Sequence, residues 1–222
     1  MPESQLIPAY ILCGGRSSRF GTDKARALFS GQPLLLKLSG ALERAGHAVH
    51  YVADRADRYR DLGITCLVDR QADRGPLAGV SRALQHRAEQ LAKYRAEHRD
   101  EQFASAADRE SPSAWLLLVS CDQSRWEVQW PTQLSSAASS VAGALAAAYY
   151  DTGWQPLPSL MHVDLSPEVE LRLQAGRLSL QGLLRDLESR GRCAKVVVSD
   201  SPSAWSFNTP EELAKLPKRP ER

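Results

Sequence analysis

Two adjacent glycines followed by basic residues are the first feature of the sequence that could do chemistry. Residues 10–25 read YILCGGRSSRFGTDKA, so an apolar run ends at Gly14 and Gly15, and Arg19 and Lys24 follow. Glycines let a backbone approach an anion, consecutive N–H groups can form a concave cradle, and basic side chains add full charges. The spacing matches neither a P-loop nor the G-x-G-x-x-G turn of dinucleotide-binding domains. The stretch therefore predicts a phosphate-binding loop of another kind or a strand-to-helix turn with solvated charges, and composition does not separate the two.

Three aspartates end apolar runs and could bind a metal ion. Asp122 follows residues 115–120 (WLLLVS), and Asp54 and Asp69 end the shorter runs VAD and LVD. A carboxylate at the carboxyl end of a central strand is well placed to hold Mg²⁺, with substrate phosphates completing the coordination shell. A helix cap or a turn aspartate is the alternative for Asp122. We expect the three carboxylates to converge on one rim of a sheet.

The third feature is a turn, DRGPLAGV, at residues 73–80. Gly75 and Pro76 predict a tight turn, and Gly79 allows close backbone approach once a helix has begun. Exposed N–H and C=O groups in such a turn could read a purine edge, whereas a plain loop–helix junction is the structural alternative.

The elements that must position these residues alternate between strand and helix. Strands are predicted at residues 7–13, 47–53, 64–68, 115–120, 144–150, 159–163 and 194–198. Helices are predicted at residues 33–45, 55–62, from 76 onward, 166–175, 179–190 and 211–216. This alternation predicts a single α/β domain over residues 1–222 with a mostly parallel sheet, in which 115–120 is a central strand that is apolar on both faces. Ligands of such sheets bind beyond the carboxyl ends of the strands.

Composition excludes several classes of function. The chain has 222 residues with a hydrophobic fraction of 43% and a formal net charge of +2, which is too small to predict a nucleic-acid or membrane partner. Its four cysteines form no C-x-x-C pair, which disfavours a zinc knuckle and fits thiols that stay reduced. The sequence has no signal-peptide pattern and no apolar run of the roughly 18 residues that a membrane helix needs, so we expect a cytoplasmic protein.

Two segments do not fit the alternation of predicted strands and helices. Residues 85–113 are nearly all polar with balanced charge, and they predict an insertion built as an extended helix tip followed by a mobile loop. Residues 217–222 close the chain in a proline-containing basic tail that we expect to be flexible.

Together the motifs resemble those of molybdenum cofactor guanylyltransferases, in the MobA-like nucleotidyltransferase family. LCGGRSSRFGTDKA, GPLAG, an aspartate after an apolar strand, and FNTPEEL occur in the family's order, from about residue 10 to residue 213. The first motif is shared by many sugar-nucleotide and cofactor nucleotidyltransferases, and the added GPLAG and NTPEEL make the combination more specific. The resemblance implies a doubly wound, Rossmann-like nucleotidyltransferase domain with helices on both faces of the sheet.

The resemblance also implies an activity and a site. It implies transfer of GMP from GTP to molybdopterin carrying molybdenum, with Mg²⁺ as cofactor and pyrophosphate as the second product. Lys24, Arg19 and Asp122 are then the catalytic candidates, with Asp122 as the metal ligand. The residues expected to bind the nucleotide or the pterin are Leu12, Cys13, Gly14, Gly15, Lys24, Asp54, Asp69, Gly75, Pro76, Leu77, Gly79 and Asn208, where GPLAG matches the guanine-side motif and Asn208 the pterin side.

The expected chemistry agrees with the residue types present. A terminal phosphate acceptor is already ionised at neutral pH, so catalysis requires positioning and electrostatic stabilisation rather than a nucleophile–base pair. Two alternatives remain open: a related enzyme that uses CTP or another phosphorylated acceptor, and a GTP-binding partner of a molybdoenzyme that no longer catalyses. The second is motivated by CDQSRW, which lacks the family's proline two residues after the aspartate, and by the polar insertion. The expected partners are GTP, the molybdopterin cofactor, and molybdoenzymes or their chaperones.

Overall fold

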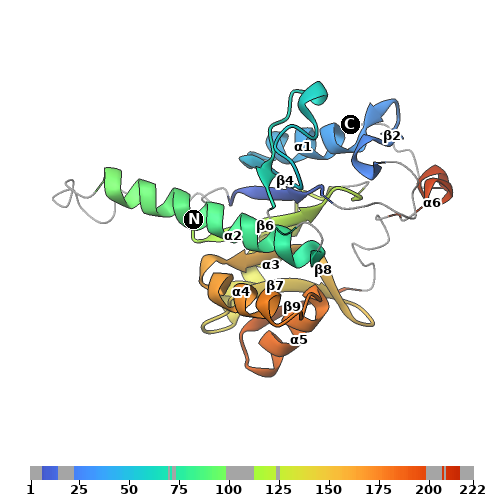
Figure 1. The fold of residues 1–222 in the computed structure, drawn as a ribbon. Coiled ribbons are helices and arrows are strands. Elements are labelled where there is room, and N and C mark those ends of the chain that lie inside the picture. The colour runs from blue at the N-terminus through green and yellow to red at the C-terminus, as the bar shows by residue number, and fades with distance from the viewer. Residues whose placement is uncertain are drawn as a thin grey trace.

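A seven-stranded sheet organises the chain (Figure 1). The computed structural model describes residues 7–14, 23–69, 71, 74–98, 113–123, 126–198, 207 and 209–215. The strand order is β5-β4-β1-β6-β8-β7-β9. The strands are β1 (Ala9–Leu12), β4 (Val49–Ala53), β5 (Leu67–Val68), β6 (Trp115–Ser120), β7 (Ala146–Tyr150), β8 (Trp154–His162) and β9 (Cys193–Val197). Only β8 runs antiparallel to its neighbours, β6 and β7, so the predicted mostly parallel sheet is confirmed for these strands.

Helices cover both faces of this sheet, as predicted. They are α1 (Leu34–Arg44), α2 (Pro76–Glu97), α3 (Trp130–Ser140), α4 (Ser166–Gln174), α5 (Leu180–Ser189) and α6 (Pro210–Lys215). Successive side chains of a strand point to opposite faces, so Leu116 and Leu118 of β6 pack in the layer of α2, α4 and α5. Leu117 and Val119 pack in the layer of α1 and α3. In Figure 1, α2 crosses the front of the sheet.

The start of α2 follows from its sequence. Gly75 adopts φ +68°, a left-handed conformation that favours glycine, and Pro76 then occupies the first helical turn, where its missing N–H costs nothing. The described part of the turn predicted at residues 73–80, from residue 74 onward, forms a loop–helix junction, and Gly79 lies on the side of the helix that faces Leu12 and Val52.

Three local features differ from the sequence-based expectations. The helix predicted at residues 55–62 is reduced to a 3₁₀ turn at Arg60–Leu62, because Gly63 ends it with φ +74°. The strand predicted at 64–68 shortens to β5. A hairpin of β2 (Leu28–Phe29) and β3 (Gln32–Pro33) was not predicted, because strands of two residues carry no periodic signal.

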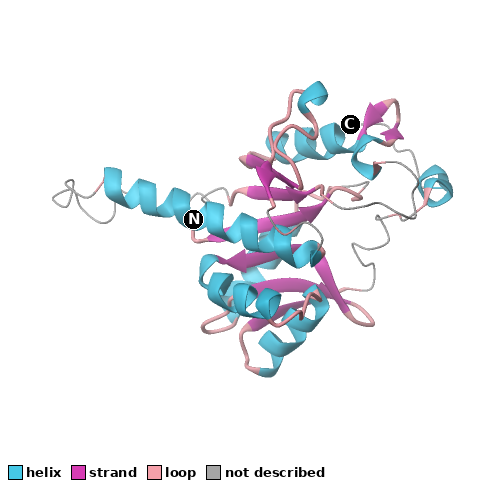
Figure 2. Cartoon of the chain, viewed as in Figure 1, coloured by secondary structure: helices cyan, strands magenta, loops and turns pink. Residues whose placement is uncertain are grey.

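The polar insertion begins as the predicted helix extension. α2 continues to Glu97, and Figure 2 shows it projecting beyond the sheet. The rest of the predicted loop, residues 99–112, and the predicted tail at 217–222 lie outside the described residues. None of the helices in the described part of the chain has both the length and the apolar character needed to cross a membrane.

Candidate functional site

Polar residues and a glycine follow four neighbouring parallel strands at one edge of the sheet. Gly14 follows β1, Asp54 follows β4, Asp69 follows β5 and Asp122 follows β6. Backbone hydrogen bonds hold these ends in register, from Asp69 N to Ala53 O at 2.7 Å and from Cys121 N to Leu12 O at 3.2 Å. The three carboxylates therefore share one rim, as expected from the sequence.

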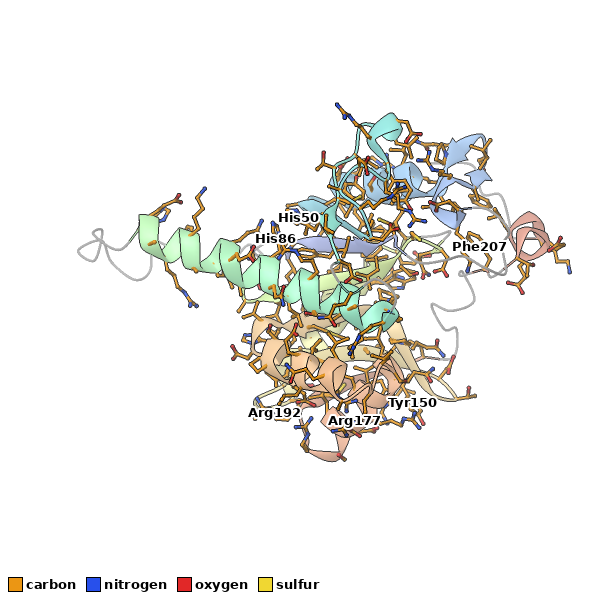
Figure 3. The ribbon with its side chains drawn as sticks, in the orientation of Figure 1. His50, His86, Tyr150, Arg177, Arg192 and Phe207 are labelled. Carbon is orange, nitrogen blue, oxygen red and sulfur yellow. The ribbon has the colours of Figure 1, made fainter. Side chains whose placement is uncertain are left out.

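Lys24 and Asp122 meet at this rim. The Nζ atom of Lys24 lies 3.4 Å from Asp122 Oδ2 and donates a hydrogen bond to the Phe207 carbonyl oxygen at 3.0 Å. Only 13% of the Lys24 side chain and 22% of the Asp122 side chain are exposed, so neither charge is fully solvated. Phe207, which is labelled in Figure 3, packs with Phe29 of β2, Leu34 of α1 and Leu213 of α6.

A short 3₁₀ helix, Lys24–Arg26, fixes the backbone from which this lysine projects. Its N-cap is Asp23, whose Oδ1 accepts a hydrogen bond from Ala25 N at 3.1 Å. Side-chain oxygens at such positions satisfy N–H groups that the first turn leaves unpaired. The direction of the Lys24 side chain therefore depends on Asp23.

A small pocket opens beside these residues, between the strand ends and the start of α2. Its volume is about 150 Å³, and it is lined by Leu12, Gly14, Val52, Ala53, Asp54, Asp69, Gly75, Pro76 and Gly79. Two glycines keep it open: a Cβ on Gly14 would lie 3.0 Å from Ala53 Cα, and a Cβ on Gly79 would lie 3.3 Å from Leu12 Cδ2. The pocket therefore needs small residues at both positions.

The two carboxylates of the pocket have different environments. Partial burial raises the pKa of Asp54, but the hydrogen bond and charge of Arg58 outweigh burial and hold the pKa below its ordinary value. Burial raises the pKa of Asp69, and the charge of Asp54 raises it further, against the effect of the hydrogen bond from Gln71 N at 2.8 Å. Asp54 thus forms an ion pair with Arg58, whereas Asp69 accepts a local hydrogen bond from the backbone of Gln71.

Three residues that the sequence analysis did not select connect the pocket to the lysine. Arg58 contacts both Asp54 and Asp23, and the buried Tyr59 hydroxyl donates to the Cys13 carbonyl oxygen at 2.6 Å. The signals that could have found them are the i,i+4 spacing of Asp54 and Arg58 and the position of Asp23 directly before Lys24.

The remaining predicted site residues divide into two groups. Leu77 is fully buried in the apolar layer beneath α2, and the Cys13 thiol is buried in the opposite layer. The contact with the Cys66 thiol and burial both raise the pKa of Cys13, so this thiol stays protonated at neutral pH. Gly15, Arg19 and Asn208 lie outside the described residues.

Metal-binding capacity at the rim depends on one carboxylate. Across the described ranges, no group of three or more His, Cys, Asp or Glu side chains is arranged to hold a metal ion. Magnesium sites that also engage substrate phosphates commonly use only one or two protein carboxylates. The partly exposed Asp122 carboxylate at a strand end fits that donor set.

Comparisons with known proteins agree with this geometry. A family profile described as "MobA-like NTP transferase domain" matches residues 9–192. The chain is 30% identical to a molybdenum cofactor guanylyltransferase of Xanthomonas euvesicatoria over 93% of this chain and 92% of that protein. It is 28% identical to a probable molybdenum cofactor guanylyltransferase of Deinococcus radiodurans, over 97% of this chain and 96% of that protein.

A solved structure shows the same fold. Molybdopterin-guanine dinucleotide biosynthesis protein A from Archaeoglobus fulgidus superposes with a TM-score of 0.65 at 18% identity, covering 94% of this chain and 96% of that chain. At this identity the likeness concerns the fold alone. Since the family profile spans most of the sequence, the chain belongs to the family of MobA-like NTP transferase domains, and it is a nucleotidyltransferase.

Proposed function

We propose that this nucleotidyltransferase transfers GMP from GTP to a molybdopterin cofactor that carries molybdenum, forming a guanine dinucleotide cofactor and pyrophosphate. The observation that carries the proposal is the meeting of Lys24 and Asp122 beside a glycine-lined pocket at the carboxyl edge of the sheet. The names of the similar proteins from Xanthomonas euvesicatoria and Deinococcus radiodurans support this choice of substrates.

The size of the pocket suggests which part of the nucleotide it would hold. Its volume of about 150 Å³ is below the roughly 300 Å³ at which pockets for whole small ligands begin. A planar base against Gly75 and Gly79 would suit this space, because their backbone groups can approach a base edge closely. The phosphates would then extend along the rim toward Gly14 and Lys24.

Catalysis in this proposal is electrostatic. A phosphate oxygen of the acceptor attacks the α-phosphorus of GTP, the bond from that phosphorus to the bridging oxygen breaks, and pyrophosphate leaves with the bonding electron pair. Lys24 would stabilise the negative charge that grows on the phosphate oxygens, in a site where it is largely shielded from water. The ionised acceptor needs no general base, and the buried Cys13 thiol stays protonated, so it does not act as a nucleophile.

Asp122 would hold Mg²⁺ in this reaction. Bound Mg²⁺ neutralises charge on transferring phosphates. Asp122 pairs with Lys24 in the structure, and this pairing keeps both side chains at the rim. The hydrogen bond from Lys24 Nζ to the Phe207 carbonyl oxygen also keeps the lysine side chain directed toward this edge of the sheet.

Label transfer tests the proposal. The enzyme is incubated with molybdenum-loaded molybdopterin and GTP that is radiolabelled at either the α- or the γ-phosphate. The proposal predicts that α-label enters the acceptor and that γ-label appears only in pyrophosphate. Label from the γ-position in the acceptor, or no α-label there, would contradict the proposed reaction.

A further inference from the structure

Arg58 joins two carboxylates that come from different parts of the site. Its Nη1 lies 2.5 Å from Asp54 Oδ1, while its Nη2 and Nε lie 3.1 Å and 3.2 Å from Asp23 Oδ2. The Arg58 side chain is 16% exposed, so these bonds are better shielded than those of an ordinary surface ion pair. Burial opposes the charge of Arg58, but its two carboxylate partners raise its pKa, so the guanidinium stays charged.

The two carboxylates belong to the two parts of the proposed site, which are the small pocket and the 3₁₀ helix that carries Lys24. Asp54 lines the small pocket together with Gly14. Asp23 caps the 3₁₀ helix that carries Lys24. One guanidinium therefore spans the distance between the pocket and the lysine.

Tyr59 adds two further contacts to this connection, one to the Cys13 carbonyl and one to Asp23. Its side chain is fully buried, and its hydroxyl lies 2.6 Å from the Cys13 carbonyl oxygen and 3.0 Å from Asp23 Oδ2. The Cys13 carbonyl belongs to the peptide that precedes Gly14, so the glycine loop and the lysine turn are braced against the same tyrosine. Both segments are thus held by the 54–59 segment and not only by each other.

We propose that Arg58 is a positioning residue that holds Lys24 at its distance from the nucleotide pocket by clamping Asp23 to Asp54. The proposal rests on the proposed function, because it assumes that Lys24 acts on the phosphates. In this proposal the role of Asp54 is to hold Arg58, and Asp54 does not contact the nucleotide directly. The planar fork of arginine suits this task because it can bond two carboxylates at once, which the point charge of lysine does less well.

A double-mutant cycle tests whether Arg58 acts through Lys24. The variants are Arg58→Met, Lys24→Ala and the double variant, with Arg58→Lys as the conservative change. Small misplacements of catalytic groups can cost about 100-fold in rate, so we expect Arg58→Met to lower kcat by roughly 30- to 100-fold. We expect KM for the nucleotide to change by less than about threefold, and Arg58→Lys to recover part of kcat.

The decisive arm is the Lys24→Ala background. In that background we expect Arg58→Met to lower kcat by less than about a further threefold, because a residue that acts by positioning Lys24 has no effect once Lys24 has been removed. A full 30-fold loss in that background would overturn the proposal, and so would wild-type kcat in Arg58→Met. The matched control is Glu97→Gln, which removes an exposed ion pair with Lys93 on α2 and touches neither Asp23 nor Asp54. It should leave kcat unchanged, and thermal unfolding of each variant separates misfolding from mispositioning.

The design distinguishes failure of this inference from failure of the proposed function. If the wild-type enzyme turns over CTP or ATP and not GTP, the proposed function fails, and the same cycle is measured with the active nucleotide. If no nucleotide is turned over, the cycle uses the dissociation constants of the four nucleoside triphosphates: Arg58→Met should weaken binding by no more than about threefold and only when Lys24 is present, and an equal weakening in the Lys24→Ala background would overturn the inference. Absence of all triphosphate binding by the wild type would overturn both.

Discussion

At the scale of single residues, the candidate site depends on the position of one ammonium group. Lys24 reaches Asp122 and the Phe207 carbonyl from a turn that is far from both in the sequence. Its side chain is mostly buried, so in our proposal its charge would act on a bound phosphate with little screening by water. This is the property that a transferase of phosphorylated substrates needs.

Removing this charge should therefore abolish most of the activity. We expect Lys24→Ala to lower kcat by about 100- to 1,000-fold, or roughly 3–4 kcal/mol of transition-state stabilisation, as for other fixed electrostatic groups. Steady-state pyrophosphate release measures the effect, and circular dichroism checks that the fold is retained. Lys93→Ala is the control, because that side chain is 77% exposed on α2. A Lys24→Ala rate within twofold of wild type would refute the assignment.

The close packing around Gly14 gives a second prediction at this scale. In Gly14→Ala the new methyl group would lie 3.0 Å from Ala53 Cα and 3.2 Å from Asp54 N, which are backbone atoms that cannot move independently. We expect a loss of about 1–3 kcal/mol in the free energy of unfolding, together with weaker nucleotide binding, as in overpacked cores. Urea titration and nucleotide binding measure the two effects. Gly153→Ala, where a Cβ meets nothing within 4 Å, should change neither, and an unaltered Gly14→Ala would contradict the packing.

The sequence allowed some of these residues to be predicted and not others. Lys24, Asp122 and the pocket glycines stand in motifs or at strand ends, where local pattern indicates chemistry. Tyr59 belongs to no such pattern, and the i,i+4 spacing of Arg58 with Asp54 does not reveal the second partner of Arg58. Asp23 and the Cys13 carbonyl are brought near these two residues only by the folded sheet. Leu77, predicted in the nucleotide motif, instead supports it from the core.

At the scale of elements, long apolar runs were the most predictable. β6 was predicted with the same bounds that the structure has, because a strand buried on both faces is a continuous apolar run. α3 was not among the predicted helices, because its buried positions, Trp130, Leu134 and Ala138, stand among serines and threonine that give little periodicity. The β2–β3 hairpin depends on Ser30 and Gly31, both with positive φ, in a stretch too short for pattern analysis.

The interface between β4 and α2 should be sensitive to acid. His50 of β4 lies with its ring centroid 4.8 Å from the rings of His86 on α2 and of Tyr10 on β1, and Figure 3 shows the two histidines together. Burial, then the charges of His86 and Arg87, lowers the pKa of His50 to about 4 from its ordinary 6.5. The unfolded chain therefore binds more protons between these values, so stability should be complete above about pH 6.5 and fall as the pH drops toward 4.

Urea unfolding across this pH window checks the effect. We expect the unfolding midpoint of the wild type to fall between near-neutral pH and about pH 5 by more than that of His50→Phe, which keeps an aromatic ring against Tyr10 and His86 and cannot be protonated. Burial lowers the pKa of His86 as well, so that variant should retain part of the slope. Equal slopes for the wild type and His50→Phe would show that this interface does not titrate.

At the scale of the whole molecule, the sheet gathers residues from opposite ends of the chain at one edge. Gly14, Asp54, Asp69 and Asp122 follow neighbouring strands, and Phe207 contacts Lys24 from the C-terminal part of the chain. Strand–helix alternation was sufficient to predict this edge, because parallel strands place their carboxyl ends together. Alternation could not reveal that β8 runs antiparallel, since strand direction depends on how the chain returns.

Substrate choice is the property that the fold leaves open. Likeness to the Archaeoglobus fulgidus protein at 18% identity concerns the architecture, and the same edge could serve different nucleotides. In our proposal the base is chosen at the Gly75–Gly79 turn, whereas the family resemblance assigns the acceptor to the pterin-side residue Asn208. The two choices can be separated by varying one substrate at a time.

The most direct test is pyrophosphate release with Mg²⁺ and molybdenum-loaded molybdopterin, comparing GTP with CTP, ATP and UTP and omitting the acceptor in parallel. The account predicts release with GTP that depends on the acceptor and is lost in Lys24→Ala. Release with CTP in place of GTP would contradict the base assignment while retaining the site. GTP binding without release, in the presence of the loaded acceptor, would contradict the central claim that this edge catalyses guanylyl transfer.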